Sequence, residues 1–269
     1  MTYKAIITDF DGTLARKDKG VCEYNIEAIC EATEKGFKFA LCTGRTTASI
    51  MKMLKPLPFK PLVGSFNGGE ITNSLTGEKI YSNALTADEC LPLIDYCLNR
   101  GLNCQIYDDE NAYCVRATRL TEFYEKTCAC PDYAVDDIKA EISRLGKTPK
   151  FMIIDEPETV DARLPEILKE FGGKYEVARS FSGLVDFTPK GNNKGLVVTE
   201  LCKIWGIDES DCIAIGDEFN DIPMLKKAGL GAAVATAQDG VKAAADYVTE
   251  RNNDDGAVGE VIRRFLLCE

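Results

Sequence analysis

Two carboxylates stand two positions apart directly after a short apolar run near the N-terminus. The run is Ala5-Ile-Ile-Thr8, and the carboxylates belong to the sequence Asp9-Phe-Asp11-Gly12-Thr13. If the strand continues, side chains two positions apart point to the same face, so both carboxylates reach one site. Two like charges at one site must be neutralised by a cation or must share a proton. The alternative is an ordinary turn capped by Asp and Gly. An EF-hand calcium loop is excluded, because Leu14 occupies the sixth position, which requires Gly.

A second acidic segment lies near the other end of the chain. The sequence Gly216-Asp217-Glu218-Phe219-Asn220-Asp221 follows the apolar run Cys212-Ile-Ala-Ile215. Hard divalent cations prefer oxygen ligands, so Asp217 and Asp221 are candidate metal ligands. Asp221 also stands where a helix is expected to begin, and its alternative role there is that of an N-cap.

Two further segments offer groups that bind anions. Thr43-Gly44-Arg45 closes an apolar strand and supplies a hydroxyl and backbone N–H groups at the start of a helix, where an anion binds readily. Lys190-Gly-Asn-Asn-Lys194-Gly195 places two lysines at the junction of a loop and a helix. Taken alone, the second has a plain explanation as a surface loop. Together, the four segments offer a carboxylate pair, a hydroxyl, a lysine and a second acidic cluster.

The composition narrows the chemistry further. The 269 residues contain no histidine, which excludes Ser–His and Cys–His catalysis as well as zinc or haem sites built on His. The net charge of −11 disfavours nucleic acids and anionic membranes as partners. The 12 cysteines are scattered through apolar stretches, so we interpret them as buried thiols. The N-terminus has no signal-peptide pattern and no apolar run approaches ~18 residues, so we expect a cytoplasmic protein.

Alternating strands and helices must position the four segments. The apolar patterns predict strands at 5–9, 37–42, 212–215 and 231–234, and helices at 25–35, 46–54, 195–205, 221–227, 240–245 and 256–267. This alternation is typical of a parallel sheet flanked by helices, in which ligands collect at the carboxyl ends of the strands. The four chemical segments all fall at that edge.

The middle of the chain is predicted to form a second α/β unit. Two short strands flank an Asn/Thr/Gly turn within Glu70–Tyr81 and predict a hairpin. Beyond it, the patterns predict helices at 87–99, 138–145 and 159–171 and strands at 103–107, 112–116, 150–154, 175–180 and 184–188. We therefore expect a core made of residues 1–82 and 187–269, with an α/β domain at 83–186 inserted between its halves.

In their order and form, the four chemical segments resemble the motifs of the haloacid dehalogenase (HAD) superfamily. Asp9-x-Asp11-Gly-Thr-Leu resembles the first motif, Thr43 the second, Lys194 the third and Gly216-Asp217-x-x-Asn220-Asp221 the fourth. Several further segments are similar to the Cof-type, type IIB branch: Thr43-Gly-Arg45, Asn67-Gly-Gly69, Pro189-Lys-x-x-x-Lys-Gly195, Asn220-Asp-Ile-x-Met224-Leu, and Ala245-Asp-Tyr-Val-Thr249 with Asp255-Gly256. The resemblance implies a HAD-like Rossmannoid core, with a parallel sheet flanked by helices, and an inserted α/β cap domain.

Some positions depart from the pattern of that branch. Ala257 stands where the branch commonly has Val, which affects no catalytic position. Within the expected cap, Cys128-Ala-Cys130, Arg116 and Arg119 match no motif, so the substrate contacts of the cap stay unassigned.

The resemblance implies phosphoryl transfer by way of a covalent intermediate. Asp9 is expected to attack phosphorus and form an aspartyl phosphate. Asp11 is expected to protonate the leaving alkoxide and then to deprotonate the attacking water. Thr43 and Lys194 are expected to hold the phosphoryl oxygens.

A Mg²⁺ ion is the cofactor that the resemblance implies. The ion is expected between Asp9, the backbone carbonyl of Asp11 and Asp217. Asp221 is expected either as a further ligand or as the residue that orients Lys194 or a metal-bound water.

The resemblance also implies contacts around the phosphoryl group. Backbone N–H groups near Gly12 and Gly44 and the side chain of Asn220 are expected to contact phosphate. Arg45 is expected to reach the substrate or the cap, with a salt bridge to the core as the alternative.

These expectations describe a Mg²⁺-dependent phosphatase that hydrolyses small phosphomonoesters. Sugar phosphates are the first substrate class, and cofactor phosphates such as pyridoxal phosphate or FMN are the second. A phosphohexomutase, which returns the phosphoryl group to a sugar, is the alternative enzyme. An inactive sensor of phosphorylated ligands is the alternative outside enzymes. The expected partner is a small phosphorylated molecule, with no nucleic acid and no membrane, and no sequence pattern indicates the oligomeric state.

Overall fold

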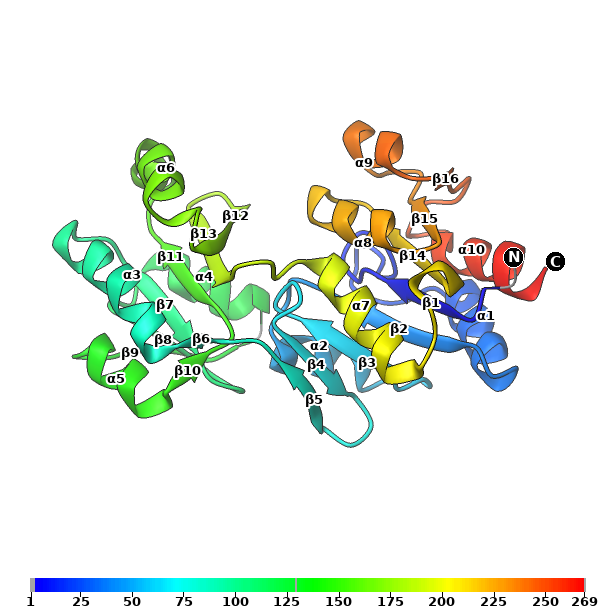
Figure 1. Cartoon of the computed structure of the whole chain (residues 1–269), viewed down its shortest axis with the longest axis horizontal. Coiled ribbons are helices and arrows are strands. Elements are labelled where there is room, and N and C mark those ends of the chain that lie inside the picture. The colour runs from blue at the N-terminus through cyan, green and yellow to red at the C-terminus, as the bar shows by residue number, and fades with distance from the viewer. Residues whose placement is uncertain (1–2, 129, 269) are drawn as a thin grey trace. The chain divides into compact units, whose positions relative to one another are not determined.

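The computed structural model describes residues 3–128 and 130–268, which form two compact units (Figure 1). Unit 1 contains the residues up to Gly44, Met51–Tyr81 and the residues from Asn193 onward. Unit 2 contains Arg45–Ile50 and Ser82–Asn192, coloured mostly cyan and green in Figure 1. The division into 1–82, 83–186 and 187–269 stays a prediction, while packing groups residues 187–192 with unit 2.

Unit 1 is built on an eight-stranded sheet with the order β16-β15-β14-β1-β2-β3-β4-β5. Neighbouring strands from β16 to β3 are parallel, whereas β4 runs antiparallel to β3. The predicted parallel sheet is therefore present and ends in an antiparallel edge. The strands are β1 (Ala5–Thr8), β2 (Lys38–Cys42), β3 (Leu62–Ser65), β4 (Glu70–Asn73), β5 (Lys79–Ser82), β14 (Cys212–Gly216), β15 (Leu230–Ala233) and β16 (Tyr247–Val248).

Helices flank this sheet. They are α1 (Glu23–Glu34), α2 (Thr47–Leu54), α7 (Lys194–Trp205), α8 (Ile222–Lys227), α9 (Asp239–Ala244) and α10 (Ala257–Val261), with short 3-10 helices at Glu209–Asp211 and Phe219–Asp221 and a π-helical turn at Ile262–Leu267. Ala5 and Ile7 of β1 pack with apolar residues of α7, α8 and α9. Because side chains alternate along a strand, Ile6 and Thr8 point to the opposite face of the sheet. The central strand β1 is buried along its whole length, which explains its uninterrupted apolar sequence.

The parallel register aligns the strand ends that carry the chemical segments. Thr8 of β1 lies opposite Leu41 of β2 and Ile215 of β14. The residues that follow these strands therefore emerge at one edge of the sheet, as expected for a parallel α/β fold.

Unit 2 is built on a six-stranded sheet with the order β12-β13-β11-β7-β8-β9 and a separate β6–β10 pair. Its strands pair antiparallel except β8 and β9, which are parallel. The strands are β6 (Leu85–Thr86), β7 (Cys104–Tyr107), β8 (Ala112–Cys114), β9 (Asp132–Ala134), β10 (Lys147–Thr148), β11 (Phe151–Ile154), β12 (Tyr175–Phe181) and β13 (Leu184–Pro189). The helices are α3 (Ala87–Asn99), α4 (Arg119–Cys128), α5 (Ile138–Leu145) and α6 (Pro157–Phe171).

The two faces of the unit 2 sheet differ in polarity. One face carries Ile106, Phe151 and Phe187, which join apolar residues of α3, α5 and α6 in a single core. The opposite face carries a buried ion pair, in which the Nζ of Lys150 lies 3.1 Å from Oδ1 of Asp186. The Lys150 ammonium also donates to the hydroxyl of Tyr124 at 3.0 Å. Burial opposes the charge on Lys150, but the Asp186 carboxylate and the Tyr124 hydroxyl outweigh it and raise the pKa of the lysine.

We expect Lys150→Met to destabilise the protein by roughly 3–5 kcal/mol, because it leaves the Asp186 charge buried without its partner. The double variant Lys150→Met with Asp186→Leu should recover most of that loss, since it removes both charges. Lys139→Met is the matched control, because Lys139 pairs with Asp95 at the surface of the same unit. Chemical denaturation measures all three variants, and equal losses for Lys150→Met and Lys139→Met would contradict the expectation.

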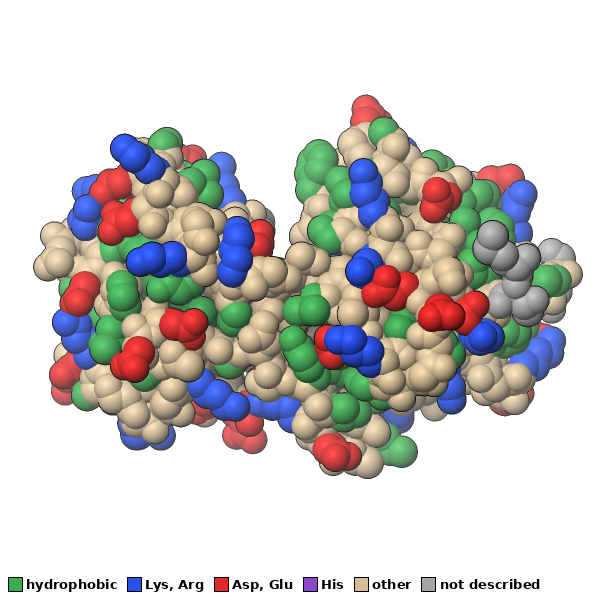
Figure 2. Space-filling view, in the orientation of Figure 1, with side chains coloured by type: hydrophobic (Ala, Val, Ile, Leu, Met, Phe, Trp, Pro, Cys, Tyr) green, Lys and Arg blue, Asp and Glu red, His purple; other side chains and the backbone are tan. Residues whose placement is uncertain are grey.

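The surface of the chain mixes charges of both signs. On the face drawn in Figure 2, Lys and Arg side chains are interspersed with Asp and Glu side chains. Among the residues that the structure describes, no helix has both the length and the apolar character needed to cross a membrane. Eight of the twelve cysteine thiols are buried, as their apolar sequence surroundings predict.

Candidate active site

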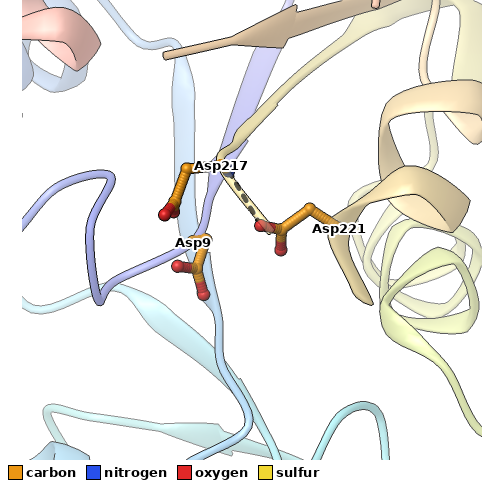
Figure 3. A group of neighbouring side chains, drawn as sticks. All are labelled: Asp9, Asp217 and Asp221. Carbon is orange, nitrogen blue, oxygen red and sulfur yellow. Dashed lines mark hydrogen bonds between the residues drawn. The ribbon is translucent and has the colours of Figure 1, made fainter. Parts of the chain in front are cut away.

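Three carboxylates converge at the carboxyl edge of the unit 1 sheet (Figure 3). Asp9 follows β1, Asp217 follows β14 and Asp221 ends the 3-10 helix Phe219–Asp221. One carboxylate oxygen of each residue lies within 4.8 Å of the others. The parallel pairing of β1 with β14 thus joins acids from the two ends of the chain.

Lys194 lies between two of these carboxylates. It is the first residue of α7, and the side chain of the N-cap residue Asn193 accepts two N–H groups of the first turn at 2.9 and 3.2 Å. The Lys194 ammonium lies 2.6 Å from Oδ1 of Asp9 and also donates to Oδ1 of Asp221. The lysine side chain is only 2% exposed. The helix cap therefore fixes the start of α7 and places a buried ammonium against two acids.

Asp221 connects this lysine to the loop that carries Asp217. Its Oδ2 accepts the backbone N–H groups of Asp217 and Glu218, each at 2.9 Å, and the first of these bonds is the dashed line in Figure 3. Since Oδ1 accepts the Lys194 ammonium, both oxygens of Asp221 already have protein partners. This arrangement suits a residue that orients Lys194 better than a residue with a free metal-binding oxygen.

The acids of the cluster are electrostatically strained. Burial raises the pKa of Asp9 well above its ordinary value, Lys194 opposes this effect, and the carboxylates of Asp221 and Asp217 add to it. Burial also opposes the charge on Lys194, but the carboxylates of Asp221 and Asp9 outweigh burial and raise the pKa of the lysine. One ammonium therefore faces three carboxylates that repel one another.

The cluster fits a hard divalent cation. When all three acids are ionised, the single Lys194 ammonium leaves two negative charges uncompensated. A divalent ion would cancel that charge, and the carboxylate oxygens of Asp9 and Asp217 are ligands that Mg²⁺ favours.

We expect the affinity for Mg²⁺ to fall below pH 6. Burial raises the pKa of Asp217 to about 6, the hydroxyl of Thr13 opposes the rise, and Asp221 adds to it. Because the metal binds ionised carboxylates, protons compete with Mg²⁺ for Asp217 below that pKa and should weaken binding by at least about tenfold per pH unit, and the raised pKa of Asp9 adds to this loss. Calorimetric titration with Mg²⁺ across this range measures the slope, and an affinity that is unchanged between neutral and acidic solution would contradict the expectation.

Asp11 lies in the same loop as Asp9, but its carboxylate has a different partner. The partly exposed Asp11 carboxylate accepts a hydrogen bond from Nζ of Lys19 at 2.9 Å. Gly12, which follows Asp11, has a φ of +79°. A Cβ at this position would lie 2.4 Å from Oδ2 of Asp217. Only glycine allows both the left-handed turn and this close approach. Next to it, the Thr13 hydroxyl donates to Oδ1 of Asp217 at 2.5 Å.

The predicted anion-binding residues Thr43 and Gly44 lie beside a loop that follows β3. Thr43 is buried, and its carbonyl accepts the N–H of Asn67 at 3.1 Å. Gly44 packs against the amide of Asn67, which also accepts a hydrogen bond from Asn220 at 3.1 Å. Arg45 groups with unit 2, where its guanidinium donates to the hydroxyl of Ser49 at 3.1 Å.

Sequence reasoning assigned no role to three residues that contact predicted site residues: Thr13, Lys19 and Asn67. Thr13 and Asn67 lie inside motifs that the sequence shows, but the sequence does not show which residues they contact. Lys19 has no sequence signal, because its approach to Asp11 depends on the turn between Arg16 and Gly20.

Comparisons with known proteins identify the family and the fold. The family of haloacid dehalogenase-like hydrolases matches residues 6–262. A haloacid dehalogenase-like hydrolase from Bacteroides thetaiotaomicron has a TM-score of 0.86 at 30% identity, with 98% of this chain and 99% of that chain covered. The HAD subclass IIB sugar phosphatase BT4131 has a TM-score of 0.79 at 25% identity, with 97% and 98% covered. The 5-amino-6-(5-phospho-D-ribitylamino)uracil phosphatase YwtE of Bacillus subtilis is 28% identical over 275 residues, which cover 94% of this chain and 95% of that protein.

The match spans both units and all four chemical segments. The predicted α/β fold and the predicted family are thereby confirmed. The chain belongs to the haloacid dehalogenase-like hydrolases.

Proposed function

We propose that the protein is a Mg²⁺-dependent phosphatase that hydrolyses small phosphomonoesters through an aspartyl-phosphate intermediate. The observation that carries this proposal is the cluster in which carboxylate oxygens of Asp9, Asp217 and Asp221 lie within 4.8 Å of one another and the Lys194 ammonium pairs with Asp9 and Asp221. The cluster combines a carboxylate nucleophile with groups that neutralise phosphoryl charge, which is the main requirement of phosphoryl transfer.

In the first step, a carboxylate oxygen of Asp9 attacks phosphorus, and the bond from phosphorus to the ester oxygen breaks. The leaving alkoxide takes a proton from the carboxyl group of Asp11, so that an alcohol departs and Asp9 carries the phosphoryl group. The position of Asp11 two residues beyond Asp9, with 36% of its side chain open to solvent, suits proton exchange with a substrate or with water.

In the second step, water attacks the phosphorus of the aspartyl phosphate. The Asp11 carboxylate accepts a proton from that water, inorganic phosphate departs, and the Asp9 carboxylate is restored. Asp11 ends this step protonated, ready for the next substrate. The same side chain therefore serves as acid and then as base.

The remaining residues hold charge in place. Lys194, the Thr43 hydroxyl and the N–H groups near Gly12 and Gly44 stabilise the phosphoryl oxygens. Asp221 positions Lys194 through the direct hydrogen bond between their side chains. Mg²⁺, held by Asp9, the carbonyl of Asp11 and Asp217, would supply charge neutralisation at the phosphoryl group.

Sugar phosphates are the proposed substrate class. One structural neighbour is named a sugar phosphatase, and one relative is named for a substrate with a phosphorylated ribityl chain. Both names describe a phosphate ester on a sugar or on a sugar-derived chain. Cofactor phosphates such as pyridoxal phosphate or FMN are the second class, and a phosphohexomutase or an inactive phospho-ligand sensor are the remaining alternatives.

A panel of metabolite phosphates tests the proposal. With Mg²⁺, we expect inorganic phosphate to be released from one or more sugar phosphates, and excess chelator should abolish that release. Conversion of a hexose 6-phosphate into its 1-phosphate isomer without phosphate release would favour the mutase instead. Binding without any turnover across the panel would favour the sensor and would refute the phosphatase.

A further inference from the structure

Three segments of the proposed phosphoryl site touch one short loop, Ser65–Gly69, which follows β3. The backbone N–H of Asn67 donates to the carbonyl of Thr43 at 3.1 Å. A Cβ at Gly68 would lie 2.6 Å from the carbonyl oxygen of Asn193, so this part of the loop packs directly against the residue before Lys194. The loop therefore lies against the segments that carry the proposed hydroxyl and lysine of the site.

The loop has an unusual backbone. Phe66, Asn67 and Gly68 are all left-handed, with φ values of 52°, 54° and 106°. This conformation is costly for residues with a Cβ and persists where the surroundings impose it, which is common at functional sites. Phe66 is 2% exposed, so its side chain serves the core. Asn tolerates the left-handed region better than most residues, but Asn67 is not buried, so core packing does not explain its side chain.

The amide of Asn67 has two polar neighbours at the site. Its Oδ1 accepts a hydrogen bond from Nδ2 of Asn220 at 3.1 Å. The same amide lies against Gly44, where a Cβ would come within 3.1 Å of Oδ1. Asn220 is exposed on the 3-10 helix Phe219–Asp221. Its side chain donates to the Asn67 amide, and this bond holds it against the loop. The orientation of the Asn220 amide thus depends on Asn67.

We propose that Asn67 is a positioning residue of the phosphoryl site, which acts by orienting Asn220. The strained loop fixes the Asn67 amide, the amide holds the side chain of Asn220, and Asn220 then presents its remaining N–H to a phosphoryl oxygen. Preorganised donors of this kind bind an anion without paying to order a mobile side chain. This inference rests on the proposed phosphatase function and adds to it a residue that acts through Asn220.

A double-mutant cycle on inorganic phosphate binding tests the proposal. The variants are Asn67→Gly, which removes the amide while suiting the left-handed backbone, Asn220→Ala, and the two combined. With Mg²⁺ present, calorimetry should show phosphate affinity about tenfold weaker for each single variant, the size expected for one hydrogen bond to a charged group. The double variant should be no weaker than either single variant, because the two residues act as one unit.

A matched variant separates positioning from general destabilisation. Asn73→Gly removes another asparagine of unit 1, whose Oδ1 accepts the N–H groups of Leu75 at 2.9 Å and Thr76 at 3.3 Å in a turn. We expect Asn73→Gly to lower the melting temperature and leave phosphate affinity unchanged. Asn67→Gly should weaken phosphate affinity and leave the melting temperature close to that of the wild type.

Two results would overturn the inference about Asn67. One is wild-type phosphate affinity in Asn67→Gly, and the other is losses that multiply in the double variant. If the wild-type protein hydrolyses phosphomonoesters while either result holds, the inference fails and the proposed function stands. If the wild-type protein neither binds phosphate nor releases it from esters, both fail. Should Asn67→Gly not fold, Asn220→Ala at its exposed position must still lose affinity for the inference to stand.

Discussion

Asp9→Asn is expected to abolish turnover, with kcat falling by about 10⁴-fold or more, because an amide cannot replace the attacking carboxylate. The substitution keeps the size and shape of the side chain, so the loss would report on the nucleophile and not on packing. Steady-state release of inorganic phosphate from the best substrate of the panel measures it. Full activity in this variant would exclude the aspartyl-phosphate route.

The same substitution should not destabilise the protein when no metal is present. Burial raises the pKa of Asp9 well above its ordinary value, so the folded protein disfavours the ionised carboxylate at neutral pH. A neutral amide removes that cost, and Lys194 keeps its hydrogen bond to Asp221. We expect a melting temperature in chelator that equals or exceeds that of the wild type. A variant that is inactive because it is unfolded would show a lower value, so this measurement is the control for the activity loss.

Asp11→Asn is expected to slow each chemical step by about 10²–10⁴-fold, which is the usual contribution of general acid–base catalysis. The first step should be affected most with alkyl phosphates, whose leaving group needs a proton. With p-nitrophenyl phosphate, whose leaving group departs without one, the first step should stay fast while the second step is slow. The variant should then release one equivalent of p-nitrophenol in a burst, followed by slow turnover.

Asp18→Asn is the matched control for this variant. Asp18 lies in the exposed turn between Arg16 and Gly20, where its carboxylate pairs with Arg16. We expect its turnover to equal that of the wild type. If Asp11→Asn hydrolyses an alkyl phosphate as fast as Asp18→Asn does, Asp11 is neither the acid nor the base.

The elements with strong apolar patterns were predictable from the sequence. The helices over Ala87–Asn99 and Ile138–Leu145 have the expected bounds, and the strand that precedes Asp9 differs from its prediction by one residue. These segments are long and periodic, or are uniformly apolar because both faces of the sheet are covered. The carboxyl ends of parallel strands lie at the same edge of a sheet. Asp9, Thr43 and Asp217, which follow such ends, therefore lie at one edge.

Other elements lacked a local signal. The strand Leu62–Ser65 is four residues long and lies between a Pro-rich segment and the left-handed loop, so its pairing with β2 sets its conformation. Helix Arg119–Cys128, by contrast, was missed although its apolar residues Leu120, Phe123, Tyr124 and Cys128 recur at helical spacing. The antiparallel edge of the unit 1 sheet depends on the pairing of β3 with β4.

The site shows the same division between what was predictable and what was not. Residues that carry chemistry, such as Asp9 and Lys194, stand out by type and by their place after a strand or before a helix. Residues that orient them do not, because Asn67 reaches Asn220 and Lys19 reaches Asp11 only through the folded backbone. In the structure, the left-handed backbone of Asn67 is the feature that points to such an orienting residue.

The covalent intermediate tests the central claim most directly. The wild-type protein is mixed with a substrate labelled in its phosphoryl group, in the presence of Mg²⁺, and the reaction is quenched in acid within the first turnover. Peptide mapping should then find the label on the peptide that contains Asp9, as a base-labile acyl phosphate, and Asp11→Asn should accumulate more of it. Steady release of phosphate with no label on that peptide at any time would contradict the account.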